Sequence, residues 1–226
     1  MSESLLAISG MKRYYEMASG TVKALDGIDL SITKGERIIL LGPSGSGKTT
    51  LLNCVAALDS PTAGSYTFEG TSVPKDSPEE MTTFRRDNIG YVFQFFNLLQ
   101  DLTVLENLLL IQELSGGRDE KRARELLDLV GLEDEVDRFP TEISGGQQQR
   151  VAIARSLAKS PRLLLGDELT GNLDSKTSAM VMEVLVKACE AEGITTIFVT
   201  HDESLIQYAT RVIRLDSGKI ISDENA

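Results

Sequence analysis

The first third of the chain carries short apolar runs separated by glycines and polar residues. Apolar runs of about 4–8 residues with such boundaries are typical of β-strands joined by turns. Gly64 and Gly70 lie on either side of one run and predict a turn at each end of it. The predicted strands are 5–8, 28–32, 37–41, 65–68 and 89–93.

The apolar residues change to helical spacing in the middle of the chain. Ser77 is followed by Pro78 and two acidic residues, a combination that favours the first turn of a helix. Further along, Ala123, Leu126 and Val130 recur at intervals of three or four, with charged residues between them. The predicted helices in this part are 103–114, 119–130 and 147–159.

The last third alternates between strand and helix patterns. The predicted order is strand 162–165, helix 175–192, strand 194–200, a short helix 203–209, and two strands around Ser217-Gly218. Such alternation favours a parallel sheet with helices packed on it. We predict one α/β domain over residues 1–226, with a mostly parallel sheet, an N-terminal antiparallel β subdomain, and an α-helical subdomain at about 95–160 inserted in the α/β core.

A glycine-rich loop follows strand 37–41 and precedes a helical stretch. Its sequence, Gly42-Pro43-Ser44-Gly45-Ser46-Gly47-Lys48-Thr49, fits the phosphate-binding pattern G-x-x-x-x-G-K-[ST] at every fixed position. Glycines let backbone N–H groups turn inward around an anion, and the helix N-terminus adds its own donors and dipole. Lys48 would bring a positive charge to the outer phosphates, and the Thr49 hydroxyl would ligate Mg²⁺. The loop predicts a P-loop NTPase core; a purely structural glycine turn is the alternative.

Two adjacent carboxylates, Asp167 and Glu168, follow the apolar run 163–165. Ligands of open α/β sheets gather at the carboxyl ends of strands, so both acids are placed to face the phosphates. We expect Asp167 to bind Mg²⁺, directly or through its water, and Glu168 to polarise the water that attacks the γ-phosphate. A pair of solvated acids at a strand end is the alternative.

A second loop of small residues leads into a helix at Ser144-Gly145-Gly146-Gln147. It resembles an anion cradle for the same reasons as the first loop. One chain with one complete nucleotide pocket does not need two cradles. We therefore expect two chains to pair head to tail, each lending this loop to the nucleotide of the other. Ser144 simply capping the helix is the alternative.

Single residues at strand ends complete the candidate site. His201 is the only histidine and follows strand 194–200, where it could reach the γ-phosphate, although a lone histidine at a strand end is more often structural. Gln94 follows strand 89–93 and could touch Mg²⁺ or the attacking water. Tyr14 and Tyr15 could stack on an adenine ring or be ordinary strand aromatics.

Composition narrows the class of protein. The chain has 226 residues, 41% apolar and 25% charged, as in globular proteins, and its longest apolar runs are far shorter than a membrane helix needs. A net charge of −11 disfavours a nucleic-acid partner and direct adhesion to anionic lipid. The N-terminus lacks the pattern of a signal peptide, and the two cysteines fit reduced, buried residues. We expect a cytoplasmic protein; if it works at a membrane, another protein would have to hold it there.

Taken in order, these motifs resemble the ATP-binding cassette (ABC) family. The likeness runs from Tyr14 to His201, and residues 144–147 are the element that other P-loop families lack. The resemblance implies that residues 42–49 form the Walker A loop and that Asp167 and Glu168 form the Walker B pair. It likewise implies an adenine-stacking aromatic at Tyr14, a Q-loop at Gln94, a signature at 144–147, a D-loop at 171–174 and a switch histidine at His201.

The resemblance also implies ATP and Mg²⁺ as cofactors and gives each motif residue a role. Nucleotide contacts are expected from Tyr14, Gly42, Pro43, Ser44, Gly45, Ser46, Gly47, Lys48, Thr49, Thr50, Ser144, Gly145, Gly146, Gln147 and Asp174. Mg²⁺ contacts are expected from Thr49, Gln94 and Asp167, and catalytic roles from Glu168, His201 and Gln94. The expected partners are a second ABC subunit, giving a homodimer with ATP at its interface, and an integral-membrane permease that holds the chain on the inner face of the membrane.

Residues 93–99 and 169–174 look like the branch of the family that serves lipoprotein release and macrolide export. Members of that branch partner a four-helix permease with a large extracytoplasmic domain and often drive mechanical work. Three positions depart from the family pattern. Ile143 replaces leucine, a near-isosteric change; Gly166 replaces a larger residue and is expected to loosen packing; and Leu169 replaces proline and is expected to alter how Glu168 is aimed.

Two other classes of protein fit parts of the pattern. A soluble ABC ATPase without a permease, acting in DNA maintenance or translation, usually carries two cassettes, a long coiled coil or a zinc insertion. This chain has one cassette, no heptad stretch and no cysteine cluster. A regulatory cassette that binds ATP without hydrolysing it is disfavoured by Glu168 and His201. The cargo is not encoded here, because in this family the permease and its associated proteins select it.

Overall fold

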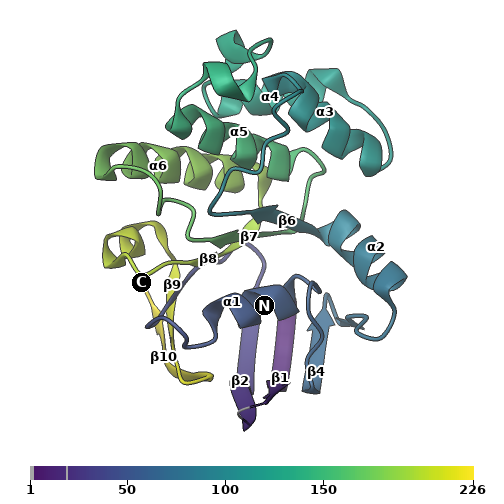
Figure 1. The fold of residues 1–226 in the computed structure, drawn as a ribbon, viewed down its shortest axis with the longest axis vertical. Coiled ribbons are helices and arrows are strands. Elements are labelled where there is room, and N and C mark those ends of the chain that lie inside the picture. Colours follow the sequence, from purple (N-terminus) through teal and green to yellow (C-terminus); the bar gives the residue numbers. More distant parts are fainter. Residues whose placement is uncertain (1–2, 19) are drawn as a thin grey trace. The chain divides into compact units, whose positions relative to one another are not determined.

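The computed structural model describes residues 3–18 and 20–226. The chain forms two compact units, Met1–Arg85 with Thr195–Ala226 and Arg86–Ile194 (Figure 1). We call them the first and the second unit.

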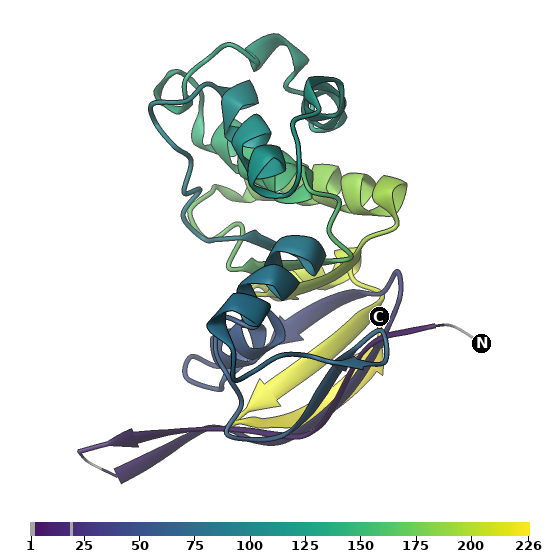
Figure 2. The same cartoon turned by 90° about the vertical axis from the view of Figure 1, so that its right-hand side faces the viewer.

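An antiparallel sheet in the first unit has the strand order β2-β1-β4-β5. Its strands are β1 (Ser4–Met17), β2 (Gly20–Thr33), β4 (Ala63–Phe68) and β5 (Thr71–Ser72). The predicted strands 5–8 and 28–32 are therefore too short. The hairpin extends because polar pairs such as Tyr14 opposite Lys23 hold its outer half together. That half projects beyond β4 in Figure 2, since the pairing of β1 with β4 stops at Lys12.

A second group of strands in the first unit surrounds β3 (Arg37–Leu41). Strand β3 pairs in parallel with β8 (Thr195–Val199) and β9 (Arg211–Asp216), and β9 pairs antiparallel with β10 (Lys219–Asn225). All five residues of β8 are buried, which explains its uninterrupted apolar and β-branched sequence. The turn at Ser217 and Gly218 has positive φ at both residues, as a tight hairpin requires.

Three helices belong to or begin in the first unit. Helix α1 (Lys48–Val55) follows β3, and α2 (Pro78–Asn88) begins after Ser77 as predicted and leads into the second unit. The predicted helix 203–209 is the 3₁₀ helix η3 (Glu203–Tyr208).

The second unit contains a parallel pair of strands, β6 (Ile89–Val92) and β7 (Leu163–Asp167). Its α-helices are α3 (Val104–Leu114), α4 (Glu120–Leu129), α5 (Gly145–Leu157) and α6 (Ser175–Glu192). Two short 3₁₀ helices, η1 (Glu133–Glu135) and η2 (Pro140–Glu142), precede α5. Fully buried side chains such as Leu108, Leu126, Ile153 and Leu185 form the core between these helices.

The caps of these helices follow from local sequence. The side chains of Thr103, Asp119, Ser144 and Asp174 each accept a hydrogen bond from a main-chain N–H in the first turn of the helix that follows. The predicted start of the third helix at residue 147 is wrong by two residues, because Ser144 and Gln147 form a capping box that places Gly145 and Gly146 inside the first turn. Strand β7 also runs two residues further than predicted and includes Asp167.

Candidate functional site

The glycine-rich loop lies between β3 and α1 and is packed tightly against neighbouring main chain. Gly42 and Gly47 have φ of 152° and 104°. A Cβ at Gly42 would stand 2.1 Å from the carbonyl oxygen of Leu215, and one at Gly47 would stand 2.3 Å from that of Ala24. Only glycine fits at either position, so the backbone of this loop is held in one shape by the strands beside it.

The Lys48 side chain is buried and directed at its own loop. Its Nζ donates to the carbonyl oxygens of Gly42, at 2.7 Å, and Pro43, at 2.9 Å. Ser46 Oγ is buried in the same loop and, within the part of the chain that the structure describes, forms no hydrogen bond. A buried ammonium group and an unsatisfied hydroxyl beside a glycine loop form a set of donors suited to phosphate oxygens.

His201 and the loop leave neighbouring strands at the same edge. Leu40 of β3 pairs with Val199 of β8, and the N–H of Thr200 donates to the carbonyl of Leu40 at 3.3 Å. His201 is the next residue and is exposed, while Gly42 begins the loop two residues after Leu40. The first unit therefore brings the predicted switch histidine and the phosphate loop to one end of β3 and β8.

The two tyrosines of the hairpin have different surroundings. Tyr14 donates its hydroxyl to the Asp26 carboxylate, which raises the pKa of Tyr14, and Lys23 Nζ lies 5.4 Å from the centre of its ring. Tyr15 donates to Asp59 at 2.7 Å and carries the Arg13 guanidinium 4.4 Å above its ring. Tyr15 is thus engaged with structural partners on β1 and after α1, whereas Tyr14 stands among the residues of the projecting hairpin.

The predicted acids and Gln94 lie at one end of the parallel pair in the second unit. Val92 of β6 pairs with Gly166 of β7, so Gln94 and Glu168 each lie two residues beyond a paired position. Burial and the nearby Asp167 carboxylate raise the pKa of Tyr91. A Cβ at Gly171 would stand 3.4 Å from Gln94 Nε2 and 3.9 Å from Glu168 Cβ, so the two predicted catalytic side chains flank Gly171.

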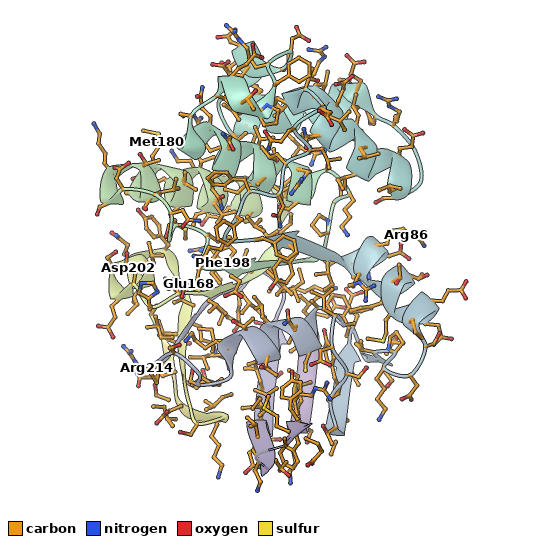
Figure 3. All side chains as sticks on the ribbon, in the orientation of Figure 1. Arg86, Glu168, Met180, Phe198, Asp202 and Arg214 are labelled. Atoms are coloured by element: carbon orange, nitrogen blue, oxygen red, sulfur yellow. The ribbon has the colours of Figure 1, made fainter. Side chains whose placement is uncertain are left out.

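Glu168, labelled in Figure 3, is the first residue after β7 and has a left-handed φ of 50°. The loosened packing expected at Gly166 is absent, because the side chain of Leu169 occupies the space next to it. Leu169 is only 4% exposed. The structure thus corrects the expectation that Gly166 leaves a gap.

Two side chains hold the segment after Gln94, and nothing in the sequence indicated this role for either. Asn172 Nδ2 donates to the carbonyl of Gln94 at 3.1 Å. The Arg155 guanidinium of α5 donates to the carbonyls of Phe96, at 3.1 Å, and Asn97, at 2.6 Å. These bonds join residues far apart in sequence to main-chain atoms, so no motif spacing could have indicated them.

The predicted signature caps α5 and contacts the start of α6. Ser144 Oγ accepts from the N–H of Gln147 at 3.3 Å, and Gln147 Oε1 accepts from the N–H of Ser144 at 2.9 Å. The capping role considered as an alternative for Ser144 is therefore present. A Cβ at Gly146 would stand 2.6 Å from Thr177 Cγ2, so glycine is needed there for α5 to approach α6.

Asp174 is the N-cap of α6 and accepts hydrogen bonds from Thr177 and from the N–H of Lys176. The hydrogen bond from the Thr177 hydroxyl is the main reason that the pKa of Asp174 is lowered. The carboxylate is thus ionised and fixed at the end of the predicted D-loop.

The predicted Mg²⁺ ligands come from both units. Thr49 lies in the first turn of α1. Gln94 lies two residues after the end of β6, and Asp167 is the last residue of β7. A hydroxyl, an amide oxygen and a carboxylate are hard oxygen donors, the kind that Mg²⁺ prefers, and the chemistry of this donor set fits that ion.

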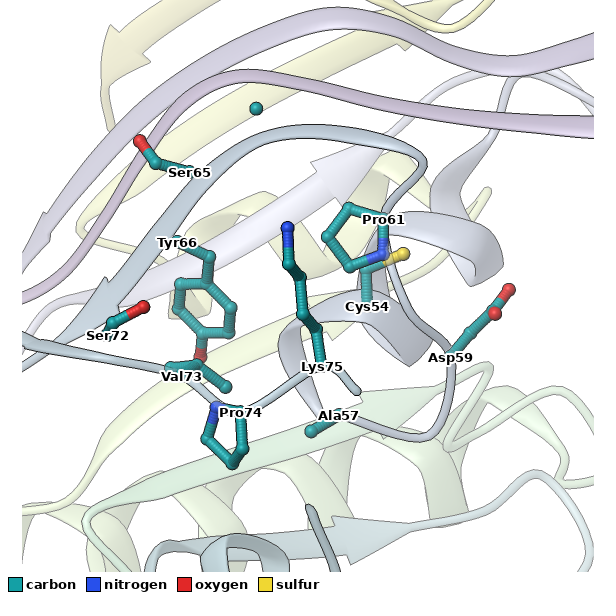
Figure 4. A pocket seen from close by; sticks show the side chains of 11 residues that line it. Cys54, Ala57, Asp59, Pro61, Ser65, Tyr66, Ser72, Val73, Pro74 and Lys75 are labelled. Atoms are coloured by element: carbon teal, nitrogen blue, oxygen red, sulfur yellow. The ribbon is translucent and has the colours of Figure 1, made fainter. Parts of the chain in front are cut away.

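A separate pocket of about 200 Å³ lies in the first unit (Figure 4). Cys54, Asp59, Tyr66 and Lys75 are among the residues that line it, and none of the lining residues belongs to the predicted site. Burial raises the pKa of the Cys54 thiol to about 12, so this cysteine is protonated and unreactive at neutral pH. The pocket therefore offers no part of the phosphate chemistry.

Comparison with known proteins decides which P-loop family this is. The sequence pattern of the family described as ABC transporter matches residues 25–171, which include the phosphate loop, the signature and the paired acids. The chain belongs to the ABC transporter family. The predicted P-loop α/β fold is confirmed, and the chain is an ATP-binding, ATP-hydrolysing component of a transport system.

Two relatives indicate which type of ABC subunit the chain is. The lipoprotein-releasing system ATP-binding protein LolD of Geobacter metallireducens is 44% identical over 223 residues, covering 97% of this chain and 99% of LolD. The macrolide export ATP-binding/permease protein MacB of Syntrophobacter fumaroxidans is 42% identical over 227 residues, covering 98% of this chain and 32% of MacB. The chain is an ABC subunit of the LolD and MacB type, and it matches about a third of the length of MacB.

A solved structure extends the comparison to three dimensions. It is described as the dimeric, post-hydrolysis state of an ATP-binding cassette bound to ADP and Pi. It matches the ABC chain with a TM-score of 0.87 and 39% identity, and the match covers 98% of both chains. Among the residues that the structure describes, no helix is long and apolar enough to cross a membrane.

Proposed function

We propose that two copies of this chain close around two ATP molecules and open after hydrolysis, and that this cycle works a membrane permease. The observation that carries the proposal is the likeness, over 98% of both chains, to a cassette described as dimeric with ADP and Pi bound. In this arrangement each copy supplies the loop at 42–49 to one nucleotide and the signature at 144–147 to the other. This explains why a chain with one P-loop also carries a second anion-binding loop at 144–147: that loop would bind the nucleotide of the partner copy.

The first unit would bind the nucleotide. Lys48 would exchange its two carbonyl partners for phosphate oxygens, which are stronger acceptors because they are charged. Ser46 Oγ would gain the hydrogen bond that it lacks among the described residues. Tyr14, with its hydroxyl already held by Asp26, would present its ring to the adenine base.

The second unit would supply the general base and the side chain that orients the attacking water. Glu168 would accept a proton from the attacking water while Gln94, on the other side of Gly171, orients that water. When bound, Mg²⁺ held by Thr49, Gln94 and Asp167 would neutralise charge on the β- and γ-phosphates. His201 would stabilise the γ-phosphate, and Asp174 would bring the D-loop to the partner copy.

An exposed apolar surface fits the membrane partner. Phe95 directly follows Gln94 and is 68% exposed, and Leu99, four residues further along the chain, is 47% exposed. Large apolar side chains exposed together favour a protein contact. We infer that a permease segment docks here and holds the chain at the inner face of the membrane. Because LolD and MacB are named for lipoprotein release and macrolide export, we propose a permease of that branch.

The oligomeric state of Glu168→Gln tests the proposal. The substitution keeps the size and shape of the side chain but replaces the basic carboxylate with a neutral amide, so ATP would bind and persist. Size-exclusion chromatography with light scattering is expected to give a dimer with Mg-ATP and a monomer without it. Lys48→Ala in the same background is the control and is expected to stay monomeric. A Glu168→Gln variant that turns over ATP at the parent rate would contradict the role of Glu168.

A further inference from the structure

We propose that Leu169 is a positioning residue for Glu168, and that it acts by packing onto Gly166 across the turn that ends β7. The inference rests on the proposed role of Glu168 as the general base. It concerns two positions at which this chain departs from the family pattern.

The contact between Leu169 and Gly166 is close and leaves no room for a larger residue at 166 unless Leu169 moves. A Cβ on Gly166 would lie 2.6 Å from Leu169 Cδ2, 2.7 Å from Cγ and 2.8 Å from Cδ1. All three distances are shorter than two carbon atoms can approach without displacement. Leu169 is only 4% exposed, so its side chain is almost completely covered by protein.

The packing spans the residue that carries the chemistry. Glu168 lies between β7 and Leu169 and has a φ of 50°, a left-handed conformation that is unfavourable for a residue with a side chain. Such a conformation persists only where its surroundings hold it. On the C-terminal side, Gly171 N–H donates to the Glu168 carbonyl at 3.1 Å. Leu169 in turn packs back onto Gly166, two residues before Glu168, and this contact holds the reversal of the chain.

The two departures therefore compensate each other. A proline after Glu168 would restrict the backbone by its ring. Leu169 lacks that restriction and restrains the turn by packing, and Gly166 is the residue that makes room for it. A change at either position is expected to reorient the Glu168 carboxylate without removing any group that binds ATP.

A double-mutant cycle tests this coupling. Gly166→Ala is expected to lower kcat about tenfold or more, since the added methyl must displace Leu169 and small misplacements of a catalytic group have effects of this size. Leu169→Ala is expected to lower kcat severalfold. In the Leu169→Ala background, Gly166→Ala is expected to have less than about a twofold effect, because the new methyl enters the space that leucine has left. The KM for ATP and the affinity for a fluorescent ATP analogue are expected to change little in all three.

Matched variants separate positioning from folding and from the role of Glu168. Leu169→Met conserves volume and is expected to keep most of the parent kcat. Glu168→Gln, assayed in parallel, is expected to abolish turnover; if it keeps the parent rate, Glu168 is not the base and this inference falls with it. If Glu168→Gln is inactive while Gly166→Ala and Leu169→Ala keep the parent kcat, the inference alone is overturned. The inference would also be overturned if Gly166→Ala lowered kcat by the same factor in the parent and in the Leu169→Ala background.

Discussion

Arg155 offers a direct way to perturb the segment after Gln94 without touching a residue proposed to contact nucleotide. Its guanidinium, on α5, bridges the carbonyls of Phe96 and Asn97. Asn97 has a φ of 51°, a left-handed conformation that asparagine adopts more readily than most residues with a side chain. Arg155→Ala removes both bonds and leaves this segment free to relax.

The expected cost follows from the two bonds. A hydrogen bond from a charged donor contributes about 1.5–3 kcal/mol, so two give roughly 3–6 kcal/mol before other effects. Freeing an arginine side chain returns about 2 kcal/mol of rotamer entropy. Asn97 is exposed, so water replaces part of what is lost at its carbonyl. We expect Arg155→Ala to lower the free energy of unfolding by about 1–2 kcal/mol, which is a drop in Tm of roughly 2–8 °C for a chain of this size.

The assay combines unfolding with activity. Calorimetry gives the Tm, steady-state ATPase measurements give kcat, and hydrogen exchange of amides 95–99 reports whether the segment has loosened. Arg124→Ala is the matched control. Among the residues that the structure describes, Arg124 bonds to the exposed Glu120 one turn away and to no other side chain, and such a pair contributes about 0.3–0.5 kcal/mol. We expect Arg155→Ala to lower kcat about tenfold and Arg124→Ala to leave it unchanged. Arg155→Ala with the Tm, kcat and exchange rates of the control would refute the reasoning.

Two further predictions concern the first unit. Gly42→Ala places a methyl group 2.1 Å from a main-chain oxygen of β9 and should lower the free energy of unfolding by about 2–4 kcal/mol. A methyl group at Gly45 would have no neighbour within 4 Å, so Gly45→Ala should lower it by only about 1 kcal/mol. Urea unfolding measures both changes. Burial opposes ionisation of Asp59, but hydrogen bonds from Tyr15 and Arg13 outweigh it and hold the pKa of Asp59 below its ordinary 3.8. The ionised group therefore stabilises the fold above about pH 4, and this contribution is lost as the pH falls through the folded-state pKa. The stability difference between the parent and Asp59→Asn should be constant above about pH 5 and shrink below pH 4; a constant difference down to pH 3 would contradict this sign.

The features that local sequence determines were predictable. The cap at Ser77 and the glycine loop follow from residues within a few positions of each other, because hydrogen bonds to the first turn of a helix are local. The outer half of the hairpin was missed, since its stability comes from polar cross-strand pairs that lack an apolar pattern.

The supports of the candidate site were not predictable. Arg155 bonds to Asn97 across 58 positions, and Asn172 bonds to Gln94 across 78, so nothing in the spacing connects them. Gly166 and Leu169 are close in sequence, but the sequence predicted looser packing at Gly166 and a different aim of Glu168 from Leu169, with no link between the two positions. Only the left-handed turn at Glu168 brings the leucine back onto the glycine. Side-chain packing across a turn needs backbone geometry that a sequence pattern does not carry.

The central claim is that the signature of one copy acts on the nucleotide of the other, and mixing two inactive variants tests it most directly. Ser144→Asp keeps a good helix cap but sets a negative charge against the γ-phosphate, and Lys48→Ala disables the P-loop. Each variant alone is expected to lack ATPase activity. In a mixed dimer the intact P-loop of one copy faces the intact signature of the other, so an equimolar mixture should recover ATPase activity that neither variant has alone. A mixture as inactive as its two components, with dimers present, would contradict the account.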